Sequence, residues 1–235
     1  MAGMRNITAI IIILMISATS AFSDDAFFPA RRGMVLLTAN LNANGRVESY
    51  NRMTIKNVST SGSNITVSFT VQVLDRNRRP VGSSGEKEYR VNISDGTLIY
   101  RFESMMDPFF TAKGMNYTMT AGNLQIPSNL APGRRLENTW MKINVAVPVV
   151  GTVTAETTIT NQVCTAIETV TVPAGTFEAY KVTQTSTTTT TGWPTPTIVN
   201  TGAAWYVRGV GVVKSITYDA RGRAESSSEL YELLN

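Results

Sequence analysis

The strictest pattern in this sequence is an alternation of apolar and polar side chains between Ile65 and Val73. Apolar residues occupy every second position there, and threonine, serine and glutamine fill the positions between them. A period of two predicts a β-strand with one face on a hydrophobic core and the other toward water, as in antiparallel sheets. Shorter alternations run from Val35 to Leu41 and from Met141 to Val147. We therefore expect a chain built mainly from amphipathic strands.

Turn signals separate these stretches at short intervals. Asp95-Gly96 lies between two apolar runs and predicts a two-residue hairpin turn. Gly45 supplies the left-handed backbone that a turn after Asn42 requires. Closely spaced hairpins favour an all-β fold, a mainly antiparallel barrel or half-barrel, over a parallel sheet. We expect one break in this pattern, a short helical or loop segment at Glu103–Phe110, where the alternation stops.

The most distinctive stretch runs from Val170 to Val182. Pro173 presets the backbone for a turn and Gly175 closes it, so the stretch predicts strand, tight turn, strand. The Val-, Ile- and Thr-rich residues before it, Thr152 to Val172, are expected to form two strands or one long bent strand. Ala203 to Tyr218 is expected to be the last long strand.

Residues 1–23 have the features of a secretory signal peptide. Arg5 precedes an apolar run from Ile7 to Ile16, which is too short to span a bilayer, and small residues follow. Cleavage after Ser23 would leave Asp24 as the N-terminus. The signal peptide and the single cysteine favour an exported bacterial protein whose mature chain has no transmembrane segment and no internal disulfide.

Residues 24–235 are expected to form a single all-β domain. A connector rich in proline and glycine, Pro127–Gly133, would divide it into halves 24–126 and 134–235. Two similar turn-forming stretches, Leu41–Ser49 and Tyr218–Ser226, fit either a duplicated half-barrel or a shared turn chemistry.

Several catalytic chemistries are excluded by composition. The chain has no histidine, which removes Ser-His-Asp and Cys-His catalysis and most catalytic zinc sites. Its only cysteine, Cys164, lies in a Val/Thr-rich strand and is expected to be a buried, inert thiol. A formal net charge of +4 without a basic block does not predict nucleic-acid binding, and no motif predicts a cofactor or a metal. We therefore expect no enzyme, although an acid-pair glycosidase built from Glu168, Glu178, Asp95 or Asp107 stays open.

Candidate binding residues gather in the segment without alternation. Met105, Met106, Phe109 and Phe110, together with Phe27, Phe28, Met115 and Met119, form an adaptable apolar set that could line a pocket for a lipid-like or other apolar ligand. The alternative interpretation is that this set is a plug that closes the end of a barrel. Trp193, set among glycine and prolines, is the best candidate for an exposed contact with a sugar.

Several features follow the signal peptide in order: Phe27-Phe28-Pro29 then Gly33, Pro127–Gly133, Val172–Phe177, and Trp205-Tyr206 before Gly209-Val210-Gly211. This arrangement spans nearly the whole mature chain and resembles a family of exported bacterial proteins of unknown function, called TapB-like. The resemblance implies an all-β exported domain and carries no catalytic residues.

Our leading hypothesis is an exported, non-enzymatic envelope protein that binds an apolar ligand or an envelope protein. It would lie in the periplasm, at the outer membrane or outside the cell. The alternative is a surface carbohydrate-binding or adhesive module, suggested by Trp193 and the threonine-rich run at Ser186–Thr191.

Overall fold

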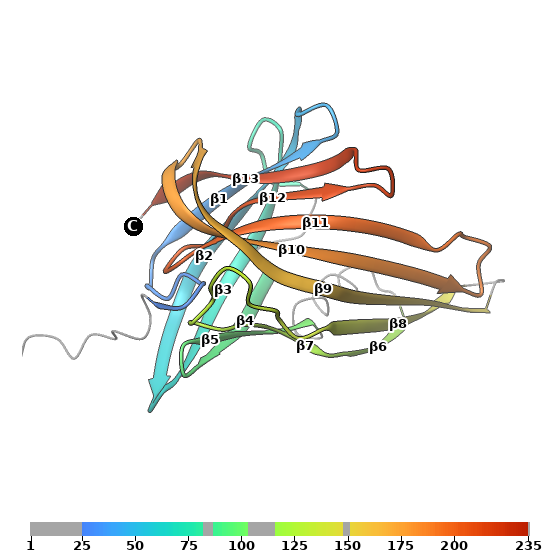
Figure 1. The fold of residues 1–235 in the computed structure, drawn as a ribbon, viewed down its shortest axis with the longest axis horizontal. Coiled ribbons are helices and arrows are strands. Elements are labelled where there is room, and N and C mark those ends of the chain that lie inside the picture. Colours follow the sequence, from blue (N-terminus) through green and yellow to red (C-terminus); the bar gives the residue numbers. More distant parts are fainter. Residues whose placement is uncertain (1–24, 82–86, 103–115, 148–150, 235) are drawn as a thin grey trace, which may run out of the picture.

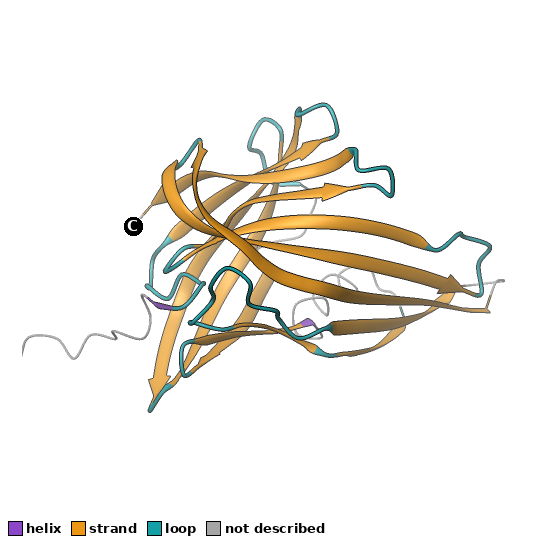
Figure 2. Ribbon diagram, in the orientation of Figure 1, coloured by secondary structure: helices purple, strands orange, loops and turns teal. Residues whose placement is uncertain are grey.

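The computed structural model describes residues 25–81, 87–102, 116–147 and 151–234. The predicted signal peptide lies outside this part of the chain. The described residues form one 13-stranded sheet with almost no helix (Figures 1 and 2). Its strands are β1 (Val35–Asn42), β2 (Val47–Ser61), β3 (Asn64–Asp75), β4 (Lys87–Ser94), β5 (Thr97–Arg101), β6 (Tyr117–Ala121), β7 (Asn123–Ile126), β8 (Thr139–Val147), β9 (Gly151–Val172), β10 (Gly175–Thr191), β11 (Ile198–Val207), β12 (Gly211–Tyr218) and β13 (Ala224–Leu234).

The sheet curls into a nearly closed antiparallel barrel, which confirms the predicted fold class. Its strand order is β6-β8-β9-β10-β11-β12-β13-β1-β2-β3-β4-β5-β7. The two edge strands, β6 and β7, are consecutive in the chain and separated only by Gly122, so the chain steps directly from one edge of the sheet to the other. A Cβ on Gly122 would lie 3.0 Å from Thr139 Oγ1, so this crossing point has little room for a side chain.

Strand β3 confirms the alternation for most of its length. Ile65, Val67 and Phe69 are buried and point to the inner face of the sheet, which carries the main hydrophobic core. The prediction is wrong at Val73, which is 44% exposed, whereas the next residue, Leu74, is fully buried. Leu74 points to the outer face, where a second hydrophobic cluster has formed.

That second cluster explains the change of face. It consists of Leu37, Ala39, Tyr50 and Leu74, with Leu41, Val47 and Tyr231 packed against it. Arg78 covers it: its guanidinium lies 5.4 Å from the Tyr50 ring and 4.9 Å from the Tyr231 ring, and it pairs with Glu232 at 2.7 Å. A sheet with apolar clusters on both faces cannot keep a strict alternation along every strand.

The inner core is closed by the segment that follows the predicted signal peptide. Phe27 and Phe28 are buried in the main cluster, so for these two residues the plug interpretation is confirmed. The Arg208 guanidinium donates hydrogen bonds of 2.6 Å to the carbonyl oxygens of Asp25 and Ser128, and thereby joins the plug to the connector between β7 and β8.

Strands β9 and β10 form the long hairpin predicted around Pro173. Residues Thr152–Val172 belong to one strand, with Asn161 in a left-handed conformation at an irregularity in its pairing. At the tip, Val172 pairs with Gly175, and the Ala174 N–H donates to the Leu230 carbonyl at 3.2 Å. The hairpin therefore curls over so that its tip packs against β13 (Figure 1).

The expectation of one strand from Ala203 to Tyr218 is wrong. β11 ends at Val207 and β12 begins at Gly211, and the two strands pair with each other as a hairpin. Gly209 and Gly211 have φ values of 69° and 96°, which break an extended backbone.

Three turns in the sheet share one geometry. The side-chain oxygens of Asn42, Asp75 and Asp219 each accept hydrogen bonds from the backbone N–H groups two and four residues later. In the turn after Asp75, Arg78 takes the left-handed position that Gly45 and Gly222 take in the others. Turn chemistry thus accounts for the similar sequences at Leu41–Ser49 and Tyr218–Ser226, and duplication of two halves stays a prediction.

Candidate functional site

The predicted binding residues fall in two places. Met105, Met106, Phe109 and Phe110 lie outside the described residues. Trp193 lies in the loop between β10 and β11 and is 51% exposed, as its glycine and proline neighbours predict.

An apolar strip lies on the inner face of strands β6, β8 and β9. We call it the inner strip, and its members are Met119, Met141, Ile143, Val145, Val153 and Ile159. Directly paired residues of adjacent strands share a face. Met119 pairs with Ile143, and Val145 pairs with Val153, which places these side chains together.

The pairing of β9 with β10 shows which face this is. Ile159 pairs with Ser186, and Ser186 lies on the same side of β10 as Val182, a buried residue of the main core. The inner strip therefore continues the core face of the barrel. Its side chains are half-buried, except that Ile143 is buried, and none of them belongs to the two hydrophobic clusters of the described residues.

The outer face of the same strands is polar. Asn144 Nδ2 donates to Thr118 Oγ1 at 3.0 Å, and Thr154 Oγ1 donates to Asn144 Oδ1 at 2.8 Å, so a hydrogen-bonded ladder crosses β6, β8 and β9. Each of these strands is thus strongly amphipathic. The apolar face of an amphipathic strand is normally covered by other apolar groups. We therefore treat the inner strip as a candidate surface for an apolar ligand.

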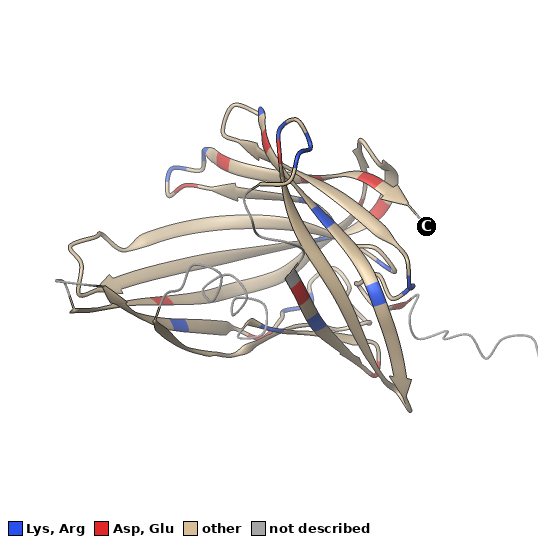
Figure 3. Cartoon of the chain, turned by 180° about the vertical axis from the view of Figure 1, so that it is seen from behind, with Lys and Arg blue, Asp and Glu red and all other residues tan. Residues whose placement is uncertain are grey.

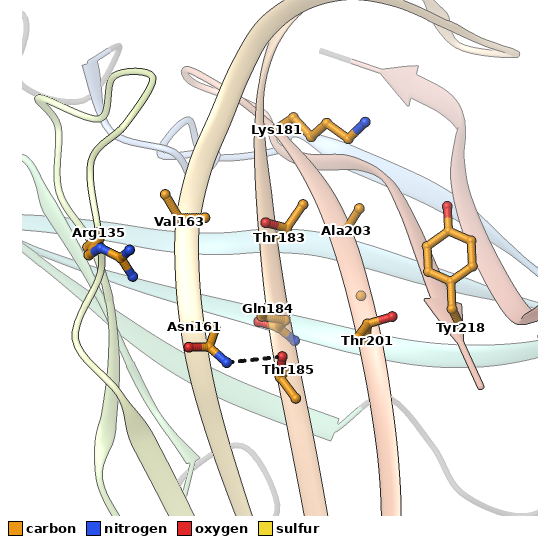
Figure 4. Close-up of a pocket in the computed structure, with 11 residues that line it drawn as sticks. Arg135, Asn161, Val163, Lys181, Thr183, Gln184, Thr185, Thr201, Ala203 and Tyr218 are labelled. Carbon is orange, nitrogen blue, oxygen red and sulfur yellow. Dashed lines mark hydrogen bonds between the residues drawn. The ribbon is translucent and has the colours of Figure 1, made fainter. Parts of the chain in front are cut away.

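A pocket of about 570 Å³ lies on strands β9 to β12 (Figure 4), and we call it the polar pocket because most of its lining residues are polar types. Lys181, Thr183 and Thr185 line it from β10, Thr201 and Ala203 from β11, Asn161 and Val163 from β9, and Tyr218 from β12. Arg135 reaches it from the connector, whose backbone bridges to Val163. Sequence reasoning missed this pocket because its members come from separate strands and none of them carries a motif.

A tryptophan and charged residues adjoin the pocket. The Trp205 indole N–H donates to the Glu168 carboxylate at 2.6 Å, and Lys181 lies 3.8 Å from the same carboxylate and 5.0 Å from the indole ring. Lys214 approaches the ring from the other neighbouring strand and pairs with Glu229 at 2.9 Å. Trp205 is therefore held in place by charged neighbours and is only 6% exposed.

The DUF3108-like family matches residues 31–230, which is most of the chain. This protein belongs to the DUF3108-like family. The resemblance to TapB-like proteins is compatible with this family, but the comparisons do not show that name.

Two solved structures have a fold similar to that of this chain. One is a protein described as exported, with a YmcC-like fold, from Bacteroides fragilis; it has a TM-score of 0.70 and 21% identity, over 89% of this chain and 99% of that one. The other is a protein described as a lipoprotein from Parabacteroides distasonis, with a TM-score of 0.71 and 21% identity, over 89% of this chain and 98% of that one. A search of curated proteins finds no match. The comparisons indicate no family of enzymes.

The carboxylates considered for a glycosidase do not form a pair on the long hairpin. Glu178 pairs with Thr169, whereas Glu168 pairs with Ala179, so the two glutamates point to opposite faces of the sheet. Asp95 occupies the left-handed first position of the hairpin turn between β4 and β5. Asp107 lies outside the described residues.

The remaining chemistry-bearing groups have structural surroundings. Cys164 is buried, and desolvation raises the pKa of its thiol, which keeps it protonated and unreactive at neutral pH. Within the described ranges, no group of three or more acidic or thiol side chains could hold a metal ion. None of the helical segments described has the length and apolar content that a membrane crossing requires. Basic and acidic residues occur at separate positions along the described strands and turns (Figure 3).

Proposed function

We propose that this protein is a non-enzymatic binding protein of the bacterial cell envelope that holds an acyl-chain ligand on the inner strip. The export part of the proposal is supported by the signal-peptide features of residues 1–23. It is also supported by the descriptions of the two structural neighbours, one as an exported protein and one as a lipoprotein.

The inner strip carries the proposal. Its side chains face the same way as the barrel core but belong to neither hydrophobic cluster of the described residues, which is the basis on which we assign the apolar ligand to this strip. Burial of an acyl chain contributes roughly 0.8 kcal/mol for each methylene removed from water, so a short stretch of chain suffices for measurable binding. Met119 and Met141 are flexible and polarisable, which suits a surface that accommodates chains of different shape.

The test uses adjacent residues of β8 that point to opposite faces. Val145 belongs to the inner strip, and Ala146 is exposed on the outer face. Binding of the fluorescent fatty acid cis-parinaric acid would be titrated for Val145→Asp and Ala146→Asp. We expect Val145→Asp to weaken binding by at least about tenfold, because a buried carboxylate loses hydration against an apolar chain, and Ala146→Asp to leave binding unchanged.

The thermal midpoint of each variant is measured first. If Val145→Asp does not fold, Met119→Gln on the edge strand replaces it. A folded inner-strip variant that binds cis-parinaric acid as tightly as the unsubstituted protein would contradict the proposal. Retention of a copurifying envelope protein, with no binding of the fatty acid, would favour a protein partner at the same strip instead.

A second candidate function is contact with carbohydrate through Trp193. The observation that favours it is the 51% exposure of this side chain at a loop tip, since exposed indole rings stack on sugar faces. Glycan-array binding that disappears in Trp193→Ala would support this function, and binding that survives the substitution would count against it.

A further inference from the structure

The polar pocket on β9–β12 has a composition unlike that of the inner strip. Its lining contains no Asp or Glu, but it contains both Arg135 and Lys181. Lys181 is partly neutralised by Glu168 at 3.8 Å, and its side chain is 32% exposed. The Arg135 guanidinium has no hydrogen bond or ion pair among the described residues, so the lining has an excess of positive charge.

The rest of the lining offers neutral hydrogen-bonding groups. Thr183, Thr185 and Thr201 present hydroxyls, and Asn161 presents an amide. Asn161 Nδ2 donates a long hydrogen bond of 3.4 Å to Thr185 Oγ1, and the Thr183 and Thr201 hydroxyls are not bonded to another lining side chain of the described residues (Figure 4). Hydroxyls and amides both donate and accept, as the hydroxyls of a sugar do.

The arrangement in space suits one polar ligand. Figure 4 shows Arg135 on one side of the pocket and Tyr218 on the other, with the threonines and amides between them. The flat tyrosine ring can pack against the apolar face of a sugar. A volume of about 570 Å³ falls within the range of roughly 300–1,000 Å³ that is usual for small-molecule sites.

We propose that this pocket binds a sugar that carries an anionic group, with Arg135 and Lys181 holding the carboxylate or phosphate. Arginine is the better suited of the two, because its planar guanidinium can pair with such a group through two parallel hydrogen bonds. The site lies apart from the inner strip, so it adds a second ligand to the proposed function and does not depend on it.

The test is titration of the full mature protein followed by amide chemical shifts in NMR. The probes are glucuronic acid, glucose 6-phosphate, glucose and inorganic phosphate. We expect glucuronic acid or glucose 6-phosphate to bind at least about tenfold more tightly than glucose, because a charged hydrogen bond is lost with the neutral sugar. Comparison of the two anionic sugars distinguishes carboxylate from phosphate as the recognised group.

Variants assign the binding to these residues. Arg135→Gln changes an exposed side chain and should weaken binding of the anionic sugar by about tenfold. Lys181→Gln should weaken it by a smaller factor, because Glu168 already faces that lysine. The control is Lys142→Gln, an exposed lysine on the same sheet face that does not line the pocket.

Three results would overturn the proposal. These are equal binding of glucose and glucuronic acid, unchanged binding in Arg135→Gln, and binding of inorganic phosphate as tight as that of glucose 6-phosphate. Arg135→Gln should leave the affinity for cis-parinaric acid unchanged, and Val145→Asp should leave the affinity for the anionic sugar unchanged. Failure at one site therefore cannot be mistaken for failure at the other.

Discussion

Replacement of Phe27 by alanine tests how far the barrel depends on its plug. Phe27 is fully buried, and its ring meets the Tyr180 ring edge-on at 5.0 Å and the Tyr206 ring at 6.2 Å. The Arg208 guanidinium lies 4.8 Å from the ring on another side. Every side of this phenylalanine thus contacts protein, and alanine would leave a cavity that rigid strands cannot close.

The expected cost follows from these contacts. Replacement of a buried phenylalanine by alanine lowers the free energy of unfolding by about 3–5 kcal/mol. Edge-to-face aromatic pairs contribute about 0.5–1.5 kcal/mol each beyond burial, which places Phe27 toward the upper end. Domains unfold with a total of about 5–15 kcal/mol, so Phe27→Ala should remove a large fraction of the stability.

The assay is urea denaturation followed by tryptophan fluorescence. The midpoint should fall while the slope of free energy against urea stays unchanged, since the same surface is exposed on unfolding. Phe177→Ala is the matched control, because Phe177 packs against the same cluster but is only half-buried, and its cost should be clearly smaller. A loss below about 1 kcal/mol for Phe27→Ala, or a loss equal to that of the control, would refute the view that the plug completes the core.

Three further predictions follow from other sites. Cys164 should react with a thiol reagent much more slowly in the folded protein than in urea, because burial raises its pKa; a rapid reaction of the folded protein would contradict this. Burial raises the pKa of Tyr206 to about 12, above the ordinary value of 10.0. The stabilisation from its buried neutral phenol should therefore be complete below pH 10 and be lost as the pH rises toward 12. Urea midpoints that stay constant over this pH range would argue against it. Gly192→Ala should destabilise the protein more than Gly222→Ala. Both glycines have positive φ, which costs about 1 kcal/mol for alanine, but only at Gly192 would the new Cβ overlap a backbone atom, the Thr152 carbonyl oxygen. Equal melting temperatures of the two variants would contradict this difference.

The fold class could be predicted because its signals are local. The alternation from Ile65 to Phe69, the Asp95-Gly96 turn and the Pro173–Gly175 turn are each decided by neighbours in sequence, and the structure confirms all three. The error at Ala203–Tyr218 is also local. The run of apolar residues predicts a continuous strand there, but Gly209 and Gly211 adopt positive φ and make a turn.

The candidate sites could be predicted only in part. Exposure of Trp193 follows from its Gly/Pro surroundings, and Met119 belongs both to the predicted apolar set and to the inner strip. The polar pocket was not predicted, because Arg135 and Tyr218 line the same pocket only after the connector, β9 and β12 have taken their places. The role of Met105–Phe110 stays a prediction, since these residues lie outside the described part.

The sequence by itself determined that this chain forms antiparallel strands, where most of them turn, and which chemistries it lacks. Periodicity and turn residues act within a few residues of the chain. The absence of histidine is a matter of composition and requires no geometry. Only the tertiary structure decided that β1 pairs with β13, that the two edge strands of the sheet adjoin each other at Gly122, and that Leu74 rather than Val73 is buried. These outcomes depend on pairing between strands that are far apart in the chain. The stabilisation comes from the side chains that meet when two strands pair, so neither strand determines it alone.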